Sequence, residues 1–116
     1  MSLEGEIFNA LKGLVGERVF PDVAPAGTVV PYATFQQVGG AAYNYVEGGP
    51  IGLRNARVQI SVWAGSRVQA SAIGNQAEDI LRSLAVLQPT VLGAGTSVFE
   101  PDTGLFGRMQ DFNFSH

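Results

Sequence analysis

The most regular pattern in the chain is an alternation of apolar and polar side chains over residues 57–63. The apolar set is Val58, Ile60 and Val62, and the alternate set, polar until its last member, is Arg57, Gln59, Ser61 and Trp63. A period of two is typical of a half-buried antiparallel strand. We expect the apolar face to pack against helices and the opposite face to meet water or another chain.

Helical spacing predicts two amphipathic helices. In the first, over residues 3–15, the apolar stripe is Leu3, Ile7, Leu11, Leu14 and Val15, and Ser2 is placed to cap its N-terminus. The second begins with a capping box of Ser66 and Gln69 and runs to about Ala85. Glu78 and Arg82 are spaced for an ion pair on its exposed side.

Proline and glycine residues mark the segments between the first predicted helix and the alternating strand. Pro21, Pro25, Gly27 and Pro31 predict an extended surface connection without a regular element over residues 19–31, followed by a strand over residues 32–38. Residues 39–54 are rich in glycine, and two interpretations stay open. They form either a long β-ribbon that turns near Gly48 and Gly49 or a flexible flap, and in both cases the segment projects.

The C-terminal third predicts a hairpin. Two β-prone runs, 96–99 and 105–114, are joined by a turn rich in proline, aspartate and glycine. Which face of the last strand is buried stays ambiguous, because Phe106, Phe112 and Phe114 share parity with Arg108 and Gln110. The order α-β-β-α-β-β predicts an α+β fold, an antiparallel sheet of about four strands with two main helices on one face, as one domain over residues 1–116.

Composition narrows the class of function. Charged residues make up 15% of the chain against roughly 25% in an average protein, with 46% hydrophobic residues, which favours an interface over a merely neutral surface. The net charge is -3 and the seven cations are scattered, so we expect no direct nucleic-acid readout. There are no cysteines and no apolar run of the roughly 20 residues that a membrane span needs, so we expect a cytoplasmic protein.

Candidate chemistry is sparse. The single histidine is His116, at the terminus where chains usually fray, and the single lysine is Lys12. Glu100, Asp102 and Asp111 are the best carboxylate cluster for a hard cation, but acidic residues at such turns are more often solvated turn formers. We therefore expect no catalytic residue, no cofactor and no metal.

Aromatic residues are the remaining candidates, because they concentrate at the energetic centres of protein interfaces. Tyr43 and Tyr45 lie in the glycine-rich segment, and the alternative for them is a hairpin that packs on its own domain. For Trp63 the alternative is ordinary packing near the second helix.

Several short motifs carry a family resemblance. They are residues 18–25 (RVFPDVAP), Pro31-Tyr32, residues 57–64 (RVQISVWA), residues 100–106 (EPDTGLF) and Gln110-Asp111-Phe112. In this order they resemble the tail completion, or tail terminator, proteins of long-tailed bacteriophages and prophages. The departure from the family is the glycine-rich segment, residues 39–53, which leaves partner specificity open.

The resemblance implies a structural protein that forms a hexameric ring on the head-proximal end of the tail tube, stops tube growth and presents a surface to the head connector. Its partners would be further copies of itself, the tail tube protein and the head connector, first in the bacterial cytoplasm and then in the virion tail. Rotationally related copies meet through two different patches. The interface residues we predict are Tyr43, Tyr45, Ile51, Leu53, Arg54, Arg57 and Trp63.

Two rival hypotheses remain. One is a small oligomeric α+β ligand-binding domain or enzyme, which predicts a concave apolar pocket between sheet and helices with convergent polar groups. The assembly hypothesis predicts instead an open, polar sheet face. The other rival is a different virion joining protein of similar size.

Overall fold

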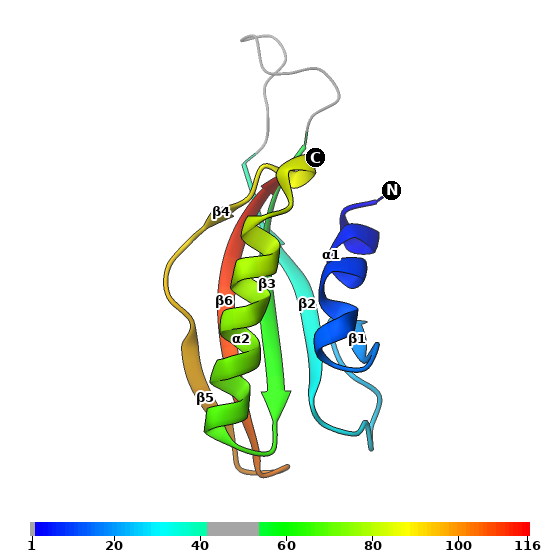
Figure 1. Ribbon diagram of the computed structural model, residues 1–116, viewed down its shortest axis with the longest axis vertical. Coiled ribbons are helices and arrows are strands. Elements are labelled where there is room, and N and C mark those ends of the chain that lie inside the picture. The colour runs from blue at the N-terminus through cyan, green and yellow to red at the C-terminus, as the bar shows by residue number, and fades with distance from the viewer. Residues whose placement is uncertain (1, 42–53) are drawn as a thin grey trace, which may run out of the picture.

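The structure is a computed structural model that describes residues 2–41 and 54–116, with two helices lying on one side of a sheet (Figure 1). The helices are α1 (Leu3–Leu11) and α2 (Arg67–Arg82), and short 3-10 turns, Lys12–Leu14 and Ala85–Leu87, come soon after them. The strands are β1 (Val19–Pro21), β2 (Tyr32–Gly39), β3 (Asn55–Ala64), β4 (Thr90–Val91), β5 (Thr96–Glu100) and β6 (Leu105–Ser115).

Strand β3 lies at the centre of the sheet, antiparallel to β2 on one side and to β6 on the other. The order is β1-β2-β3-β6-β4, and β4 and β5 share the outer edge of β6. The predicted α+β class, with two main helices on one face, is confirmed. Two very short strands, β1 and β4, widen the sheet beyond the four long runs that the sequence pattern indicates.

The predicted absence of regular structure over residues 19–31 is wrong at its beginning. Strand β1 pairs in parallel with β2, with Val19 opposite Ala33 and Pro21 opposite Phe35, so the sheet is mixed. Proline lacks an N–H and is tolerated in a strand at a sheet edge, where no further strand needs that donor. Residues 22–30 form the connection that the prolines predict.

Both predicted N-caps are present. The Ser2 hydroxyl accepts a hydrogen bond from the Gly5 N–H at 3.0 Å, and the Ser66 hydroxyl accepts one from the Gln69 N–H at 3.2 Å. Both helices end slightly earlier than the apolar spacing predicts. In α1 the last turn tightens into the 3-10 turn, which still brings Val15 into the core.

The core lies between the sheet and the two helices. Its largest fully buried side chains are Phe112, Phe114, Ile7, Leu11, Leu81, Val15, Val58 and Val62. The burial of Phe112 and Phe114 settles the facing of β6, whose even-numbered side chains point toward the helices. Arg108 and Gln110 therefore also lie on the helix side, where polar groups of α2 receive them.

Candidate interaction surface

The face of the sheet opposite the two helices has no described helix over it (Figure 1). The alternation seen in the sequence creates this face, because the residues of β3 that do not enter the core point here. The β3 residues on this face are Arg57, Gln59, Ser61 and Trp63. Beside them on the flanking strands lie Thr34, Gln36, Met109 and Asp111. We call this surface the open face.

A hollow of about 880 Å³ lies on the open face. Its floor is formed by residues of the three central strands: Tyr32, Thr34, Gln36, Gln59, Ser61, Trp63 and Met109. One wall is the connection 22–30, and the other is the turn between β5 and β6, including Glu100, Thr103 and Leu105. The hollow is therefore built by neighbouring strands together with one loop and one turn.

Trp63 is half-buried on this face and lines the hollow. An ideal Cβ on Gly107 would lie 2.7 Å from the Trp63 ring and 2.8 Å from a Val98 methyl, so the indole rests against the glycine backbone of β6. Trp63 thus packs against β6 across from the second helix, contrary to the packing near α2 that its sequence position suggests. The Trp63 side chain also lines the hollow.

Two polar pairs lie on the open face or at the edge of the hollow. Arg57 forms an ion pair with Asp111, with 2.7 Å between Nη2 and Oδ2, and Thr103 donates to the Glu100 carboxylate at 2.8 Å. Burial raises the pKa of the Tyr32 hydroxyl, and the negative charge of Glu100 raises it further. Among residues 2–41 and 54–116, no three His, Cys, Asp or Glu side chains are grouped to hold a metal ion.

Of the remaining predicted interface residues, the structure describes Arg54 alone. Arg54 is exposed, and its backbone exchanges hydrogen bonds of 2.6 and 2.7 Å with His116, so the described C-terminus is paired instead of frayed. Tyr43, Tyr45, Ile51 and Leu53 lie outside the described residues, as does most of the segment for which a ribbon and a flap were considered.

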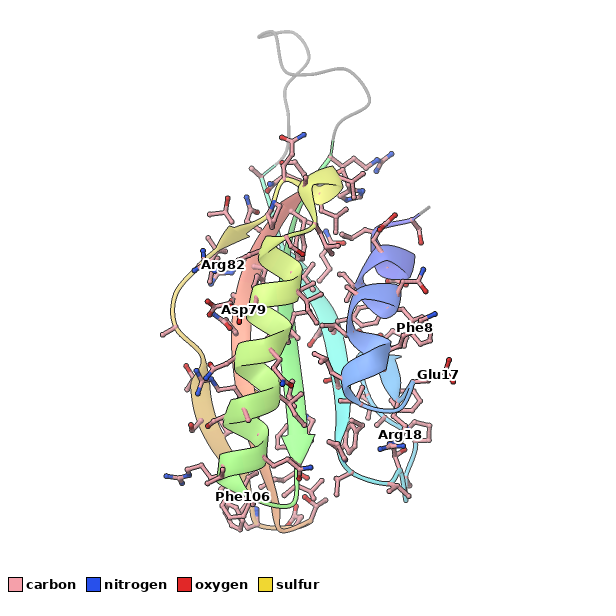
Figure 2. The ribbon with its side chains drawn as sticks, in the orientation of Figure 1. Phe8, Glu17, Arg18, Asp79, Arg82 and Phe106 are labelled. Carbon is pink, nitrogen blue, oxygen red and sulfur yellow. The ribbon has the colours of Figure 1, made fainter. Side chains whose placement is uncertain are left out.

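The sequence patterns do not predict a polar network that lies on the helix side. Gln110 donates to the Glu78 carboxylate at 2.6 Å and to the Gly93 carbonyl at 2.7 Å, and Arg82 donates to Glu78 at 3.1 Å. These hydrogen bonds, with the positive charges of Arg82 and Arg108, hold the pKa of Glu78 below its ordinary value. Arg82 extends from the side of α2 that faces away from α1 (Figure 2).

Arg108 crosses the same region between two glycines. An ideal Cβ would lie 2.6 Å from the arginine chain at Gly74, and at Gly95 it would overlap the guanidinium. The Arg108 guanidinium donates to Asn75 at 3.1 Å and to Ser71 at 3.4 Å. The sequence signal for this arrangement was a glycine inside the second predicted helix, which normally weakens a helix and here makes room for an arginine.

Little space exists between the sheet and the helices. The larger recess described there is about 10 Å³ and is lined by Ile60, Val62, Gly74, Ala77, Arg108, Gln110 and Phe112. That volume is roughly enough for a single water molecule. The pocket that the ligand-binding hypothesis predicts between these layers is absent from the described part of the chain.

These observations define an α+β domain in which the large recess described above lies on the sheet face that no described helix covers. Residues 8–116 match the family model for tail completion protein gp17, and the chain belongs to that family. The resemblance stated from the sequence is thereby confirmed, and the protein is a phage tail structural protein. None of its described helices has the length and apolarity to cross a bilayer.

A known structure has a similar fold. A chain from the virion of a native gene transfer agent particle is similar in structure, with a TM-score of 0.65 and 15% sequence identity. The match covers 98% of this chain and 93% of that chain, so the two share the fold over nearly their whole lengths. No significant match was found among curated protein sequences.

Proposed function

We propose that this protein forms a hexameric ring on the head-proximal end of a phage tail tube, stops tube growth and joins the tail to the head connector. Family membership supports a place in the tail. The observation that carries the proposal is the open face, because a hollow of about 880 Å³ lies on an uncovered sheet while the space between the layers is filled. Such a surface suits a neighbouring polypeptide.

Each copy in a ring needs two different contact patches, because rotationally related subunits meet through unlike surfaces. One patch in this proposal is the open face with Arg57 and Trp63. The other consists of Tyr43, Tyr45, Ile51 and Leu53, with Arg54 beside it. Aromatic residues at these places would supply most of the binding energy.

In this function the protein would have no catalytic activity, cofactor or metal, and would fold as one domain over residues 1–116. It would accumulate in the bacterial cytoplasm and then enter the virion tail. A ligand-binding domain or enzyme is the alternative, and the filled space between sheet and helices disfavours its predicted pocket. A different virion joining protein would use the same surfaces with other partners.

A complementation assay tests the proposal. Phage lacking this gene would be supplied with protein carrying both Tyr43→Ala and Tyr45→Ala, and joined particles would be counted by electron microscopy and by infectious titre. We expect a fall of at least about tenfold, because each lost interface aromatic costs about 1 kcal/mol or more at every one of the repeated contacts.

The matched control is Phe99→Ala, which removes an aromatic that is 50% exposed on β5 and stands outside the hollow. We expect near wild-type titre from this control. Unchanged joining by the double tyrosine variant would remove those residues from the interface, and normal tails made without any copy of the protein would contradict the function itself.

A further inference from the structure

The lining of the hollow on the open face is nearly uncharged. Its charged members are Asp22 and Glu100, both acidic, and the rest are apolar, hydroxyl or amide side chains. Val23 and Val29 on its wall are 77% and 67% exposed, so the wall presents two large apolar side chains that another surface can cover. A volume of about 880 Å³ lies within the range of sites that enclose a drug-sized group, which is also the scale of a few side chains.

Residues 42–53 have a composition that matches this lining. They contain two tyrosines together with valine, isoleucine and leucine, and Glu47 is their single charged residue. Arg54, the next residue, is exposed and offers a positive charge to the acidic lining. A weakly charged, aromatic segment is the chemistry that such a hollow would bind.

The chain's own segment is too short to reach the Trp63 end of the hollow. Strand β2 ends and β3 begins at the end of the sheet opposite Trp63 (Figure 1), and residues 42–53 belong to the sequence between them. Trp63 lies nine residues beyond Arg54, about 30 Å along an extended strand. A connection of twelve residues between two neighbouring strands can extend at most about half its contour length, roughly 20 Å.

We propose that the hollow of one copy receives residues 42–53 of the neighbouring copy in the ring. This inference rests on the proposed function, since it names the surface that the aromatic segment occupies there. The strand ends that flank the donating segment, Gly39 and Asn55, and the Trp63 end of the hollow lie at opposite ends of the sheet. The contact is therefore head-to-tail, the kind of interface that closes into a ring when the rotation per subunit allows it.

The absence of cysteine from the sequence makes a direct test possible, because each introduced thiol is then the single one in its chain. One chain carries Asn44→Cys, which keeps both tyrosines. A second chain, distinguished by a mass tag, carries Val29→Cys on the wall of the hollow. The matched control chain carries Val68→Cys at the start of α2, on the helix side of the molecule, where the valine is 81% exposed against 67% for Val29.

The tagged and untagged chains are mixed with tail tube protein, assembled and mildly oxidised, and disulfide-linked heterodimers are quantified. We expect at least about tenfold more heterodimer with Val29→Cys than with Val68→Cys, because a docked segment has a high effective concentration at its site. Native mass spectrometry of the same samples, kept reduced, reports whether rings have formed.

Intact rings with equal yields from the two positions, or without any heterodimer, would overturn this inference and leave the proposed function standing. A disulfide between Asn44→Cys and a cysteine placed in the tail tube protein, without one to Val29→Cys, would also overturn it by assigning the segment to the tube. Absence of rings in all samples would contradict the proposed function, and the inference with it.

Discussion

Gly107 determines how Trp63 lies on the open face. The residue is buried at the centre of a three-strand contact, with Trp63 of β3 on one side and Val98 of β5 on the other. A methyl group at this position would approach both side chains to less than 3 Å, closer than side-chain carbons normally come. The floor of the hollow therefore depends on a missing side chain.

Replacing Gly107 with alanine should destabilise the fold by about 1–3 kcal/mol, the usual cost of adding a methyl group to a filled space. Urea denaturation followed by tryptophan fluorescence measures both the stability and the environment of Trp63. The control is Gly13→Ala, whose new methyl group would meet no atom within 4 Å. Equal stability of the two variants would show that the Trp63 ring moves aside freely.

The sequence could not reveal these close contacts. Trp63 was recognised as a candidate from the alternation of its strand, but its partner Gly107 is distant in the chain and nothing local marks it. Gly74 and Gly95 pose the same difficulty, since each makes room for Arg108 from a different element. Asp111 was considered as a metal ligand, and its pairing with Arg57 depends on a register between two strands.

At the scale of elements, Glu78 connects α2 to β6 and, through Gln110, to the connection that follows β4. Its pKa is lower in the folded chain than its ordinary value, so the folded state binds a proton there less readily than the unfolded state does. The resulting stabilisation is present above the ordinary pKa of a glutamate, roughly 4.3, and is lost as the pH falls through the lower folded-state value.

Glu78→Gln should therefore reduce the free energy of unfolding at pH 7 and have a smaller effect at a pH below the folded-state pKa. The measurement is urea denaturation of both proteins across the acid range. Asp79→Asn is the control, because Asp79 is the exposed neighbour of Glu78 on α2 and lies outside this network. A difference between wild type and Glu78→Gln that stays constant down to the lowest pH would contradict this role for Glu78.

Periodicity predicted the main elements because their local patterns agree with their packing. The alternation of β3 and the capped stripe of α2 are examples, and both are confirmed. Strand β1 is not predicted from the sequence, because pairing with β2 holds its three residues and no local pattern indicates that pairing. The facing of β6 stayed ambiguous because Arg108 and Gln110 share a face with buried phenylalanines, and their partners lie on α2 and the following connection.

The molecule as a whole has two unlike sides. On the helix side of the sheet lie the core and the polar network around Glu78. On the other side, the open face, lies the hollow. Of the predicted interface residues, Arg57 and Trp63 lie on the open face and Arg54 lies at its end. With 15% charged residues against roughly 25% in an average protein, the chain has few ionic groups with which to keep an exposed sheet face solvated.

The mass of the purified protein, measured by native mass spectrometry with and without tail tube protein, tests the central claim most directly. The account predicts a species of six copies in the presence of the tube, whether or not the same species forms alone. Trp63→Ala should reduce its abundance, because the variant loses part of the floor of the hollow. A protein that stays monomeric under both conditions, while remaining folded, would contradict the claim that the open face binds further copies of the chain.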